Sequence, residues 1–158
     1  MYTPQDHTFV ICAYKENPYL ETLIESILNQ TVLGDVIIST STPNDHIKSL
    51  AEKYHIKLVV NPHPKTAGTD WNYGYDSADT KLVTIAHQDD FYEPEFLEKT
   101  LAAANTFSEY ENVILIYTDY FEIRNNEKVY SNAILNIKSV MNRPFTAKAV
   151  NRNQIAKR

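Results

Sequence analysis

The chain has 158 residues, of which 43% are hydrophobic and 22% charged, and a formal net charge of −5 from 15 basic and 20 acidic residues. This composition is typical of one soluble globular domain, and the negative charge argues against nucleic acid as a partner. The single cysteine, Cys12, excludes a disulfide framework and a thiolate zinc site, and the lack of a membrane-length apolar run predicts a cytoplasmic protein without a transmembrane segment.

Short apolar runs rich in β-branched residues predict strands, which we expect over residues 8–13, 36–38, 57–60, 82–86 and 113–117. Helix starts, each followed by apolar side chains at helical spacing, alternate with these runs. We expect one helix to begin at Asn17 and Pro18, a second to be opened by residues 42–45, and two more over residues 69–77 and 94–107. A hairpin with its turn at residues 124–127 follows.

Strands and helices alternate as far as about residue 117, which predicts an α/β fold. We expect a Rossmann-like, mostly parallel sheet with helices on both faces, formed by residues 1–142. Residues 143–158 contain five basic residues and no acidic one. We expect them to form a basic tail or the start of a further, acceptor-binding part.

Polar side chains follow every predicted strand, at the edge where ligands of parallel sheets bind. They include Tyr14 and Glu16, Thr40 and Ser41, Asn61, the run His87-Gln88-Asp89-Asp90, and Asp119. An aromatic face such as that of Tyr14 can stack on a base, and the hydroxyls of Thr40 and Ser41 can bond a base edge or a ribose. The two adjacent aspartates offer the oxygen ligands that suit Mg²⁺ or Mn²⁺.

The acidic pair also has a simpler interpretation, because adjacent aspartates after a strand can form a solvated turn that caps the next helix. The chain has only three glycines, so it lacks a glycine-rich phosphate loop. A diphosphate bound at this edge would therefore need another source of positive charge, such as a cation. The convergence of polar residues on one edge favours a ligand site over a simple turn.

Several segments resemble family 2 glycosyltransferases, in the order in which that family has them. Residues 9–31 contain Ala13-Tyr14, Asn17-Pro18-Tyr19-Leu20 and Ser26-Ile27-Leu28-Asn29-Gln30-Thr31, similar to the strand, turn and helix with which the family begins. Asn72-x-Gly74 with Ala78 is similar to the helix before the family's fourth strand. His87-Gln88-Asp89-Asp90 with Pro94 resembles its metal motif, and Thr118-Asp119-Tyr120 resembles a later strand end.

The resemblance implies a GT-A fold that binds a nucleotide-diphosphate sugar across the strand ends, with a UDP-sugar as the expected donor. It places Ala13, Tyr14, Glu16, Thr40, Ser41, Asn72 and Asp90 at the donor nucleotide, and Asp89 with His87 at a divalent cation, Mg²⁺ or Mn²⁺. The implied reaction is metal-assisted transfer of the sugar to a hydroxyl of a glycan or lipid-linked acceptor. Such transfer serves cell-surface polysaccharide biosynthesis, in the cytoplasm or at the inner face of the membrane.

The chain departs from the family pattern at three places. His87 replaces the first acid of the metal motif, Thr40 and Ser41 replace an acidic pair, and Trp71 stands where the family often has an arginine. The general base usually lies well downstream, where Asp119 or Glu122 would have to serve. The alternative is a catalytically incomplete domain that binds the nucleotide sugar without transferring it.

Two other classes of α/β protein fit the sequence less well. A nucleotidyltransferase usually carries a glycine-rich loop with a basic residue after the first strand, and a CheY-like receiver needs an acidic pair there. Residues 13–16 provide neither pattern.

Overall fold

The computed structural model describes residues 1–106, 115–118, 120–125 and 127–142. It divides into two compact units, Met1–Thr106 and Phe107–Arg158. Asp119 and the predicted basic tail, residues 143–158, lie outside the described residues, so the predicted boundary after residue 142 stays a prediction. In the described part of the chain, no helix combines the length and the apolar character needed to cross a membrane.

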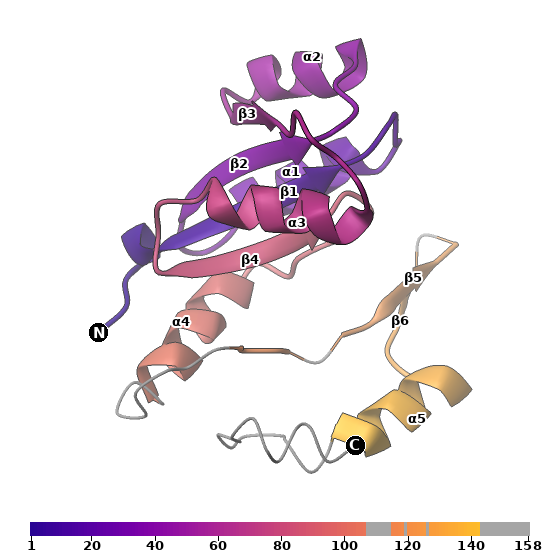
Figure 1. Ribbon diagram of the computed structural model, residues 1–158. Helices are drawn as coiled ribbons and strands as arrows, with labels where there is room; N and C mark the ends of the chain where they lie inside the picture. Colours follow the sequence, from indigo (N-terminus) through magenta and orange to yellow (C-terminus); the bar gives the residue numbers. More distant parts are fainter. Residues whose placement is uncertain (107–114, 119, 126, 143–158) are drawn as a thin grey trace. The chain divides into compact units, whose positions relative to one another are not determined.

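A four-stranded parallel sheet forms the centre of the first unit (Figure 1). Its strands are β1 (His7–Ala13), β2 (Asp35–Thr40), β3 (Lys57–Val60) and β4 (Leu82–His87), in the spatial order β3-β2-β1-β4. The register pairs Thr40 with both Ala13 and Val60, and it pairs Cys12 with His87. The carboxyl ends of all four strands therefore meet at one edge of the sheet.

Helices cover both faces of this sheet (Figure 1). The helices of the first unit are α1 (Leu20–Leu28), α2 (Asp45–Lys53), α3 (Ala67–Asp76) and α4 (Phe96–Thr106), with a 3-10 turn, η1 (Pro4–Asp6), before β1. Helices α1, α2 and α4 share one core cluster with Phe9 and Ile11, while α3 lies over Val10 and Ser39. Successive residues of a strand point to opposite faces, so β1 supplies both layers.

The amphipathic pattern of α1 is what holds it on the sheet. Leu20, Leu23, Ile24 and Ile27 recur at helical spacing, and each is at most 1% exposed. Full burial of one such side chain contributes about 1.5–3 kcal/mol. The start of α2 is stabilised by an N-cap. The Asn44 side chain accepts a hydrogen bond from the Ile47 N–H.

Most predicted elements of the first unit are confirmed, with ends that differ by a few residues. The first helix begins at Leu20 instead of Pro18, because Asn17 forms a turn in which its side chain accepts from the Tyr19 N–H. The third helix begins two residues earlier than predicted, because Thr66 caps it.

The predicted strand over residues 113–117 is wrong for the part that the structure describes. Residues 115–118 belong to no strand, and Leu115 is 72% exposed; residues 113 and 114 lie outside the described residues. A run of apolar, β-branched residues indicates that a segment tends to be buried. A strand also needs a neighbouring strand with which to form hydrogen bonds, and the run does not show whether there is one.

In the second unit, the predicted hairpin is confirmed. Strands β5 (Glu122–Arg124) and β6 (Glu127–Val129) pair antiparallel, and Asn125 adopts the left-handed conformation, with φ 51°, that tight turns require. Helix α5 (Ala133–Asn142), which the sequence analysis did not include, begins where the Asn132 side chain accepts from the Leu135 N–H.

His7 makes the stability of the first unit depend on pH. The side chain is 1% exposed, its Nε2 lies 2.8 Å from Thr84 Oγ1, and its Nδ1 has no hydrogen-bond partner among the described residues. Burial lowers the pKa of His7 from 6.5 to about 4. The unfolded chain therefore takes up this proton first, so stability is full above pH 6.5 and is lost as the pH falls toward 4. We expect a loss of about 2 kcal/mol at pH 5.

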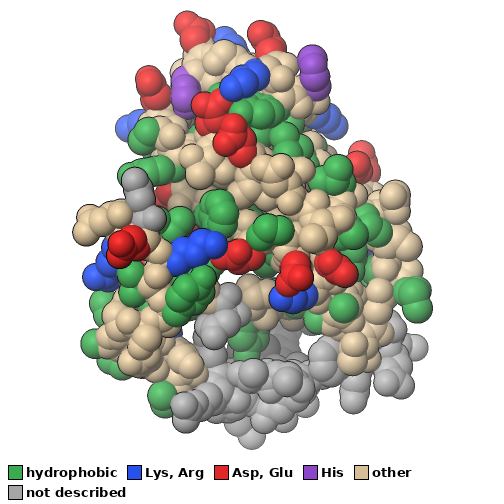
Figure 2. All heavy atoms as spheres, turned by 180° about the vertical axis from the view of Figure 1, so that it is seen from behind, with side chains coloured by type: hydrophobic (Ala, Val, Ile, Leu, Met, Phe, Trp, Pro, Cys, Tyr) green, Lys and Arg blue, Asp and Glu red, His purple; other side chains and the backbone are tan. Residues whose placement is uncertain are grey.

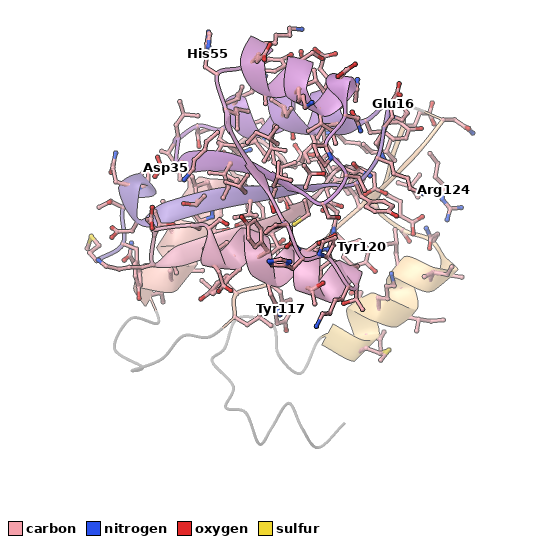
Figure 3. The ribbon with its side chains drawn as sticks, turned by 45° about the horizontal axis from the view of Figure 1, so that its top comes forward. Glu16, Asp35, His55, Tyr117, Tyr120 and Arg124 are labelled. Atoms are coloured by element: carbon pink, nitrogen blue, oxygen red, sulfur yellow. The ribbon has the colours of Figure 1, made fainter. Side chains whose placement is uncertain are left out.

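Urea unfolding at pH 7 and pH 5 checks this expectation. His7→Gln should remove most of the loss, while His55→Asn, at an exposed position with φ 54° that asparagine tolerates, should keep it (Figure 3). The carboxyl of Asp6 does not contribute to this loss. A hydrogen bond from Lys81 lowers the pKa of Asp6 from 3.8 to about 2, so Asp6 affects stability only at a pH below the range compared. The same loss of stability in the wild type, in His7→Gln and in His55→Asn would exclude His7 as the cause.

Candidate functional site

The segment after β1 is fastened to both neighbouring strands. The Gln88 side chain pairs with the backbone of Tyr14, accepting from its N–H at 2.9 Å and donating to its carbonyl at 2.9 Å. On the other side, the Lys15 N–H donates to Thr42 Oγ1 at 2.6 Å. Lys15 has φ 56°, so the chain turns sharply here. The structure therefore holds the end of β1 between those of β2 and β4.

The predicted nucleotide-binding residues around β1 differ in their access to a ligand. Ala13 is buried at the end of the strand, whereas Tyr14 is 51% exposed, with Lys15 Nζ 5.1 Å from the centre of its ring. Glu16 is exposed and lies at the opposite end of the sheet from Asp35 (Figure 3). Tyr14 and Glu16 are thus available to a ligand, while Ala13 can present only its backbone.

The turn after β4 uses its two aspartates differently. Asp90 Oδ2 accepts from the His87 N–H at 3.0 Å, and the Asp90 N–H donates to the His87 carbonyl at 2.9 Å, which closes the turn. The Asp89 side chain is exposed and has no hydrogen bond or ion pair within the described part of the chain. The His87 ring packs edge-on against Trp71, with 4.9 Å between ring centres. Asp89 is therefore the acid that is free to meet a ligand.

At the end of β2, the structure adds a residue that the sequence analysis missed, Asp70. Ser41 Oγ donates to Asp70 Oδ2 at 2.5 Å, and Asn61 Nδ2 donates to Asp70 Oδ1 at 2.7 Å. Thr40 is buried, and its Oγ1 accepts from the Thr42 N–H at 3.0 Å. Asp70, on α3, thus joins the end of β2 to the residue that follows β3.

A pattern in the sequence could have identified Asp70. It stands four residues before Gly74, and residues with this spacing lie on the same face of a helix. At Gly74, α3 approaches the sheet closely, since a Cβ there would lie 2.6 Å from Val10 Cγ1. The face that carries Gly74 therefore also aims Asp70 at the strand ends.

Asn72 lies on another side of α3 from Asp70. It is exposed and borders an open hollow. The hollow is lined by Asn61, Pro62, His63, Thr69, Asn72, Tyr73 and Asp76. The hollow therefore places Asn72 near Asn61, which follows β3.

The surface around α2 carries both signs of charge. Figure 2 shows acidic and basic side chains next to one another at the top of the molecule, where α2 lies. Helix α2 contains Asp45, Lys48, Glu52 and Lys53. Mixed charge of this kind does not form the basic stripe that nucleic acids require.

Residues 8–155 match the sequence profile of Glycosyl transferase family 2. The chain belongs to this family. The match confirms the resemblance that the ordered motifs indicated, and it covers nearly the whole sequence.

A curated protein and solved glycosyltransferase structures are similar to this chain as well. EpsH of Bacillus subtilis (strain 168), named provisionally as a glycosyltransferase, is 27% identical over 121 residues, which cover 73% of this chain and 34% of EpsH. S. aureus TarS 1-349, in a crystal structure with UDP-GlcNAc, has a TM-score of 0.55 at 17% identity, covering 74% of this chain and 38% of TarS 1-349.

The mannosyltransferase PcManGT from Pyrobaculum calidifontis, solved with GDP-Man and Mn²⁺, has a TM-score of 0.54 at 18% identity, covering 61% of this chain and 31% of PcManGT. These likenesses confirm the predicted GT-A fold. The family 2 chain spans about a third of the length of EpsH and less than two fifths of these two solved proteins.

The predicted cation can be compared with the ligands that this family 2 chain offers. Among the described residues, no three His, Cys, Asp or Glu side chains lie close enough together to hold a metal ion. Mg²⁺, however, is usually bound by one or two carboxylates together with substrate phosphates and water. The exposed and unpaired carboxylate of Asp89 fits this second arrangement, in which the cation arrives with the diphosphate.

Two partly buried groups near the strand ends stay protonated at neutral pH. Burial, aided by the negative charge of Asp70, raises the pKa of the Cys12 thiol to about 11. Burial, with smaller contributions from Asp90 and Cys12, also raises the pKa of Tyr92 well above its usual range. Neither group is therefore a ready nucleophile or general base.

Proposed function

We propose that this chain is the donor-binding part of a glycosyltransferase, which binds a nucleotide-diphosphate sugar and transfers the sugar to an acceptor hydroxyl. The observation that carries the proposal is the unpaired carboxylate of Asp89 at the edge where the ends of β1, β2 and β4 are fastened together. The names of the similar structures, which contain UDP-GlcNAc and GDP-Man, support a nucleotide sugar as the ligand. A UDP-sugar is the donor that we propose.

In this proposal each strand end has its own role. The Tyr14 ring and the Ser41 hydroxyl face the nucleoside, with Glu16 and the backbone of Ala13 beside them, and Thr40 supports the turn after β2. Asp89 would hold a divalent cation, Mg²⁺ or Mn²⁺, with the imidazole of His87 as a second ligand. A bound cation would supply positive charge to the departing nucleoside diphosphate. Asp90 holds the turn that presents Asp89.

Transfer also requires a base for the acceptor hydroxyl, and two exposed carboxylates at the strand ends, Glu16 and Asp89, are assigned above to the nucleoside and the cation. The carboxylates of Asp70 and Asp90 are both engaged in hydrogen bonds. Asp119 lies outside the described residues. This observation favours a second candidate function, which is binding of the nucleotide sugar without transfer. Measurable transfer to any glycan or lipid-linked acceptor would decide against it. For the first candidate function, transfer of the sugar, we propose a cytoplasmic location at the inner face of the membrane.

Calorimetric titration with UDP-GlcNAc and GDP-mannose, each with and without Mn²⁺, tests donor binding. We expect Mn²⁺ to increase the affinity for one of the two donors, and Asp89→Ala to lower the affinity in Mn²⁺ by about ten-fold, the effect of losing one charge-assisted contact of about 1.4 kcal/mol. Asp35→Ala is the matched control, because Asp35 is also exposed but lies at the other end of the sheet (Figure 3).

Three results would contradict the proposal. The first is that neither donor binds with or without Mn²⁺, and the second is that Asp89→Ala binds as tightly as the wild type. The third is that Asp35→Ala weakens binding as much as Asp89→Ala does, since the loss would then not be specific to the strand ends.

A further inference from the structure

The carboxylate of Asp70 receives hydrogen bonds from two sides. Ser41 Oγ donates to one oxygen at 2.5 Å and Asn61 Nδ2 donates to the other at 2.7 Å. Asn61 is 6% exposed, and its own oxygen accepts from the His63 N–H at 3.0 Å, so its amide orientation is fixed. Asp70 itself is part of no ion pair among the described residues. The geometry therefore fixes which partner donates in each of the two bonds.

This arrangement determines the hydrogen-bonding character of the end of β2. A serine hydroxyl has one proton to donate, and that of Ser41 is used on Asp70. The lone pairs that remain on Ser41 Oγ and on the Asp70 carboxylate can only accept. Both residues are partly exposed, so a ligand can reach them. The end of β2 thus offers acceptors to any ligand group that approaches it.

We propose that Asp70 is a specificity-determining residue, which holds the Ser41 proton so that the end of β2 accepts a hydrogen bond from the nucleoside of the donor. This inference rests on the proposed function. The ring N–H of uracil or guanine can donate such a bond, and so can the 2′-hydroxyl of the ribose. Cytosine has a lone pair at the corresponding ring nitrogen and would face another acceptor. If the base supplies the hydrogen, the site favours uracil or guanine over cytosine, and if the ribose supplies it, the site favours ribose over 2′-deoxyribose.

Asp70→Asn tests this proposal with little change of shape. An asparagine side chain has one oxygen and one NH₂ group. Its oxygen can still accept from Asn61, and its NH₂ then faces Ser41, whose hydroxyl accepts from it and becomes free to donate. The variant therefore reverses the polarity of the site. Ser41→Ala, in contrast, removes the hydroxyl that donates to Asp70, but the lone pairs of the carboxylate can still only accept, so this variant should not reverse the preference.

The experiment is calorimetric titration of the full chain with UDP, GDP, CDP and 2′-deoxy-UDP in Mn²⁺. We expect the wild type to bind UDP or GDP about ten-fold more tightly than CDP, and Asp70→Asn to bring this ratio to one or below. If the hydrogen comes from the ribose, Asp70→Asn weakens UDP and CDP alike and leaves 2′-deoxy-UDP unchanged. Either result supports the proposal, and it identifies the source of the hydrogen.

Asp35→Asn controls for the loss of a negative charge and should leave all four affinities unchanged. The inference is overturned if the wild type binds all four ligands equally, or if Asp70→Asn changes all four affinities by the same factor or not at all. A uniform change indicates a structural role only. If the wild type binds none of the four ligands, it is the proposed function that fails, so the two failures are distinguishable.

Discussion

Replacement of Gly74 by alanine is expected to lower the free energy of unfolding by about 2–3 kcal/mol, although alanine is the better helix former by about 1 kcal/mol. A Cβ at this position would lie 2.6 Å from Val10 Cγ1 and 3.1 Å from Ser39 Cβ. Val10 is 0% and Ser39 3% exposed, so neither strand can move aside easily. Overpacking of a buried site typically costs about 1–3 kcal/mol and occasionally more. Because both contacts of the added Cβ are short, we expect a cost in the upper part of this range. Urea unfolding measures the effect.

Gly68 provides the matched control, because it lies in the same helix. A Cβ there would meet only Thr66 Oγ1, at an ordinary 3.7 Å. Gly68→Ala is therefore expected to be neutral or to stabilise by up to about 1 kcal/mol. In a double-mutant cycle, Val10→Ala should relieve part of the cost of Gly74→Ala, since it removes the contacting methyl. Equal effects of the two glycine substitutions would show that close approach of α3 is not what Gly74 provides.

The close approach at Gly74 also has a consequence for the candidate site. Asp70 lies one helical turn before Gly74 on the same face of α3, so the distance between helix and sheet at Gly74 sets how far Asp70 reaches. Ser41 and Asn61 bond Asp70 from the ends of β2 and β3. We therefore interpret the Asn72-x-Gly74 motif as a packing motif whose glycine positions an acid that lies outside the motif.

The sequence predicted the sheet well because β1 and most of β2 are buried, while β3 and β4, which are less buried, are still rich in apolar residues. Such strands read as continuous apolar runs, and the runs that begin near residues 8, 36, 57 and 82 all became strands of one parallel sheet. The helices between them were predicted from spacing and caps, which are also local. The error at residues 115–117 has the same origin, because a local run cannot show whether a neighbouring strand exists.

The candidate site was predictable only in outline. The rule for strand ends places Tyr14, Ser41 and Asp89 at one edge, and the structure does so. Which groups are free depends on contacts between residues that are far apart in sequence. Gln88 pairs with Tyr14 across 74 positions, and Asp70 reaches Ser41 across 29. The family resemblance assigned Asp89 to the cation, but no pattern in the sequence shows that Asp89 is unpaired in the described part of the chain while Asp90 closes the turn.

Gln30 is the residue for which we expect the second large effect, a loss of about 3–4 kcal/mol in Gln30→Leu. Its side chain is 7% exposed, donates to the carbonyls of Ser26 and Glu93 at 3.0 and 2.8 Å, and accepts from the Leu97 N–H at 2.9 Å. Leucine has a similar volume but no polar atoms. It would leave these backbone groups without their partner in a buried place, at about 1–3 kcal/mol for each group that stays unsatisfied.

Gln88→Leu is the matched control, since Gln88 also bridges backbone groups, but at an exposed site. Its two bonds to Tyr14 can be replaced by water, so we expect a loss below about 1 kcal/mol. Gln30 joins the end of α1 to the segment that follows the His87–Asp90 turn, and the Thr31 N–H adds a bond of 2.8 Å to the Pro94 carbonyl. Gln30→Leu should therefore also loosen that segment, seen as faster amide exchange at Leu97 than in Gln88→Leu. Equal losses of unfolding free energy in Gln30→Leu and Gln88→Leu would show that burial does not set the strength of these hydrogen bonds. Equal amide exchange at Leu97 in the two variants would show that the end of α1 does not support the segment after the turn that carries Asp89.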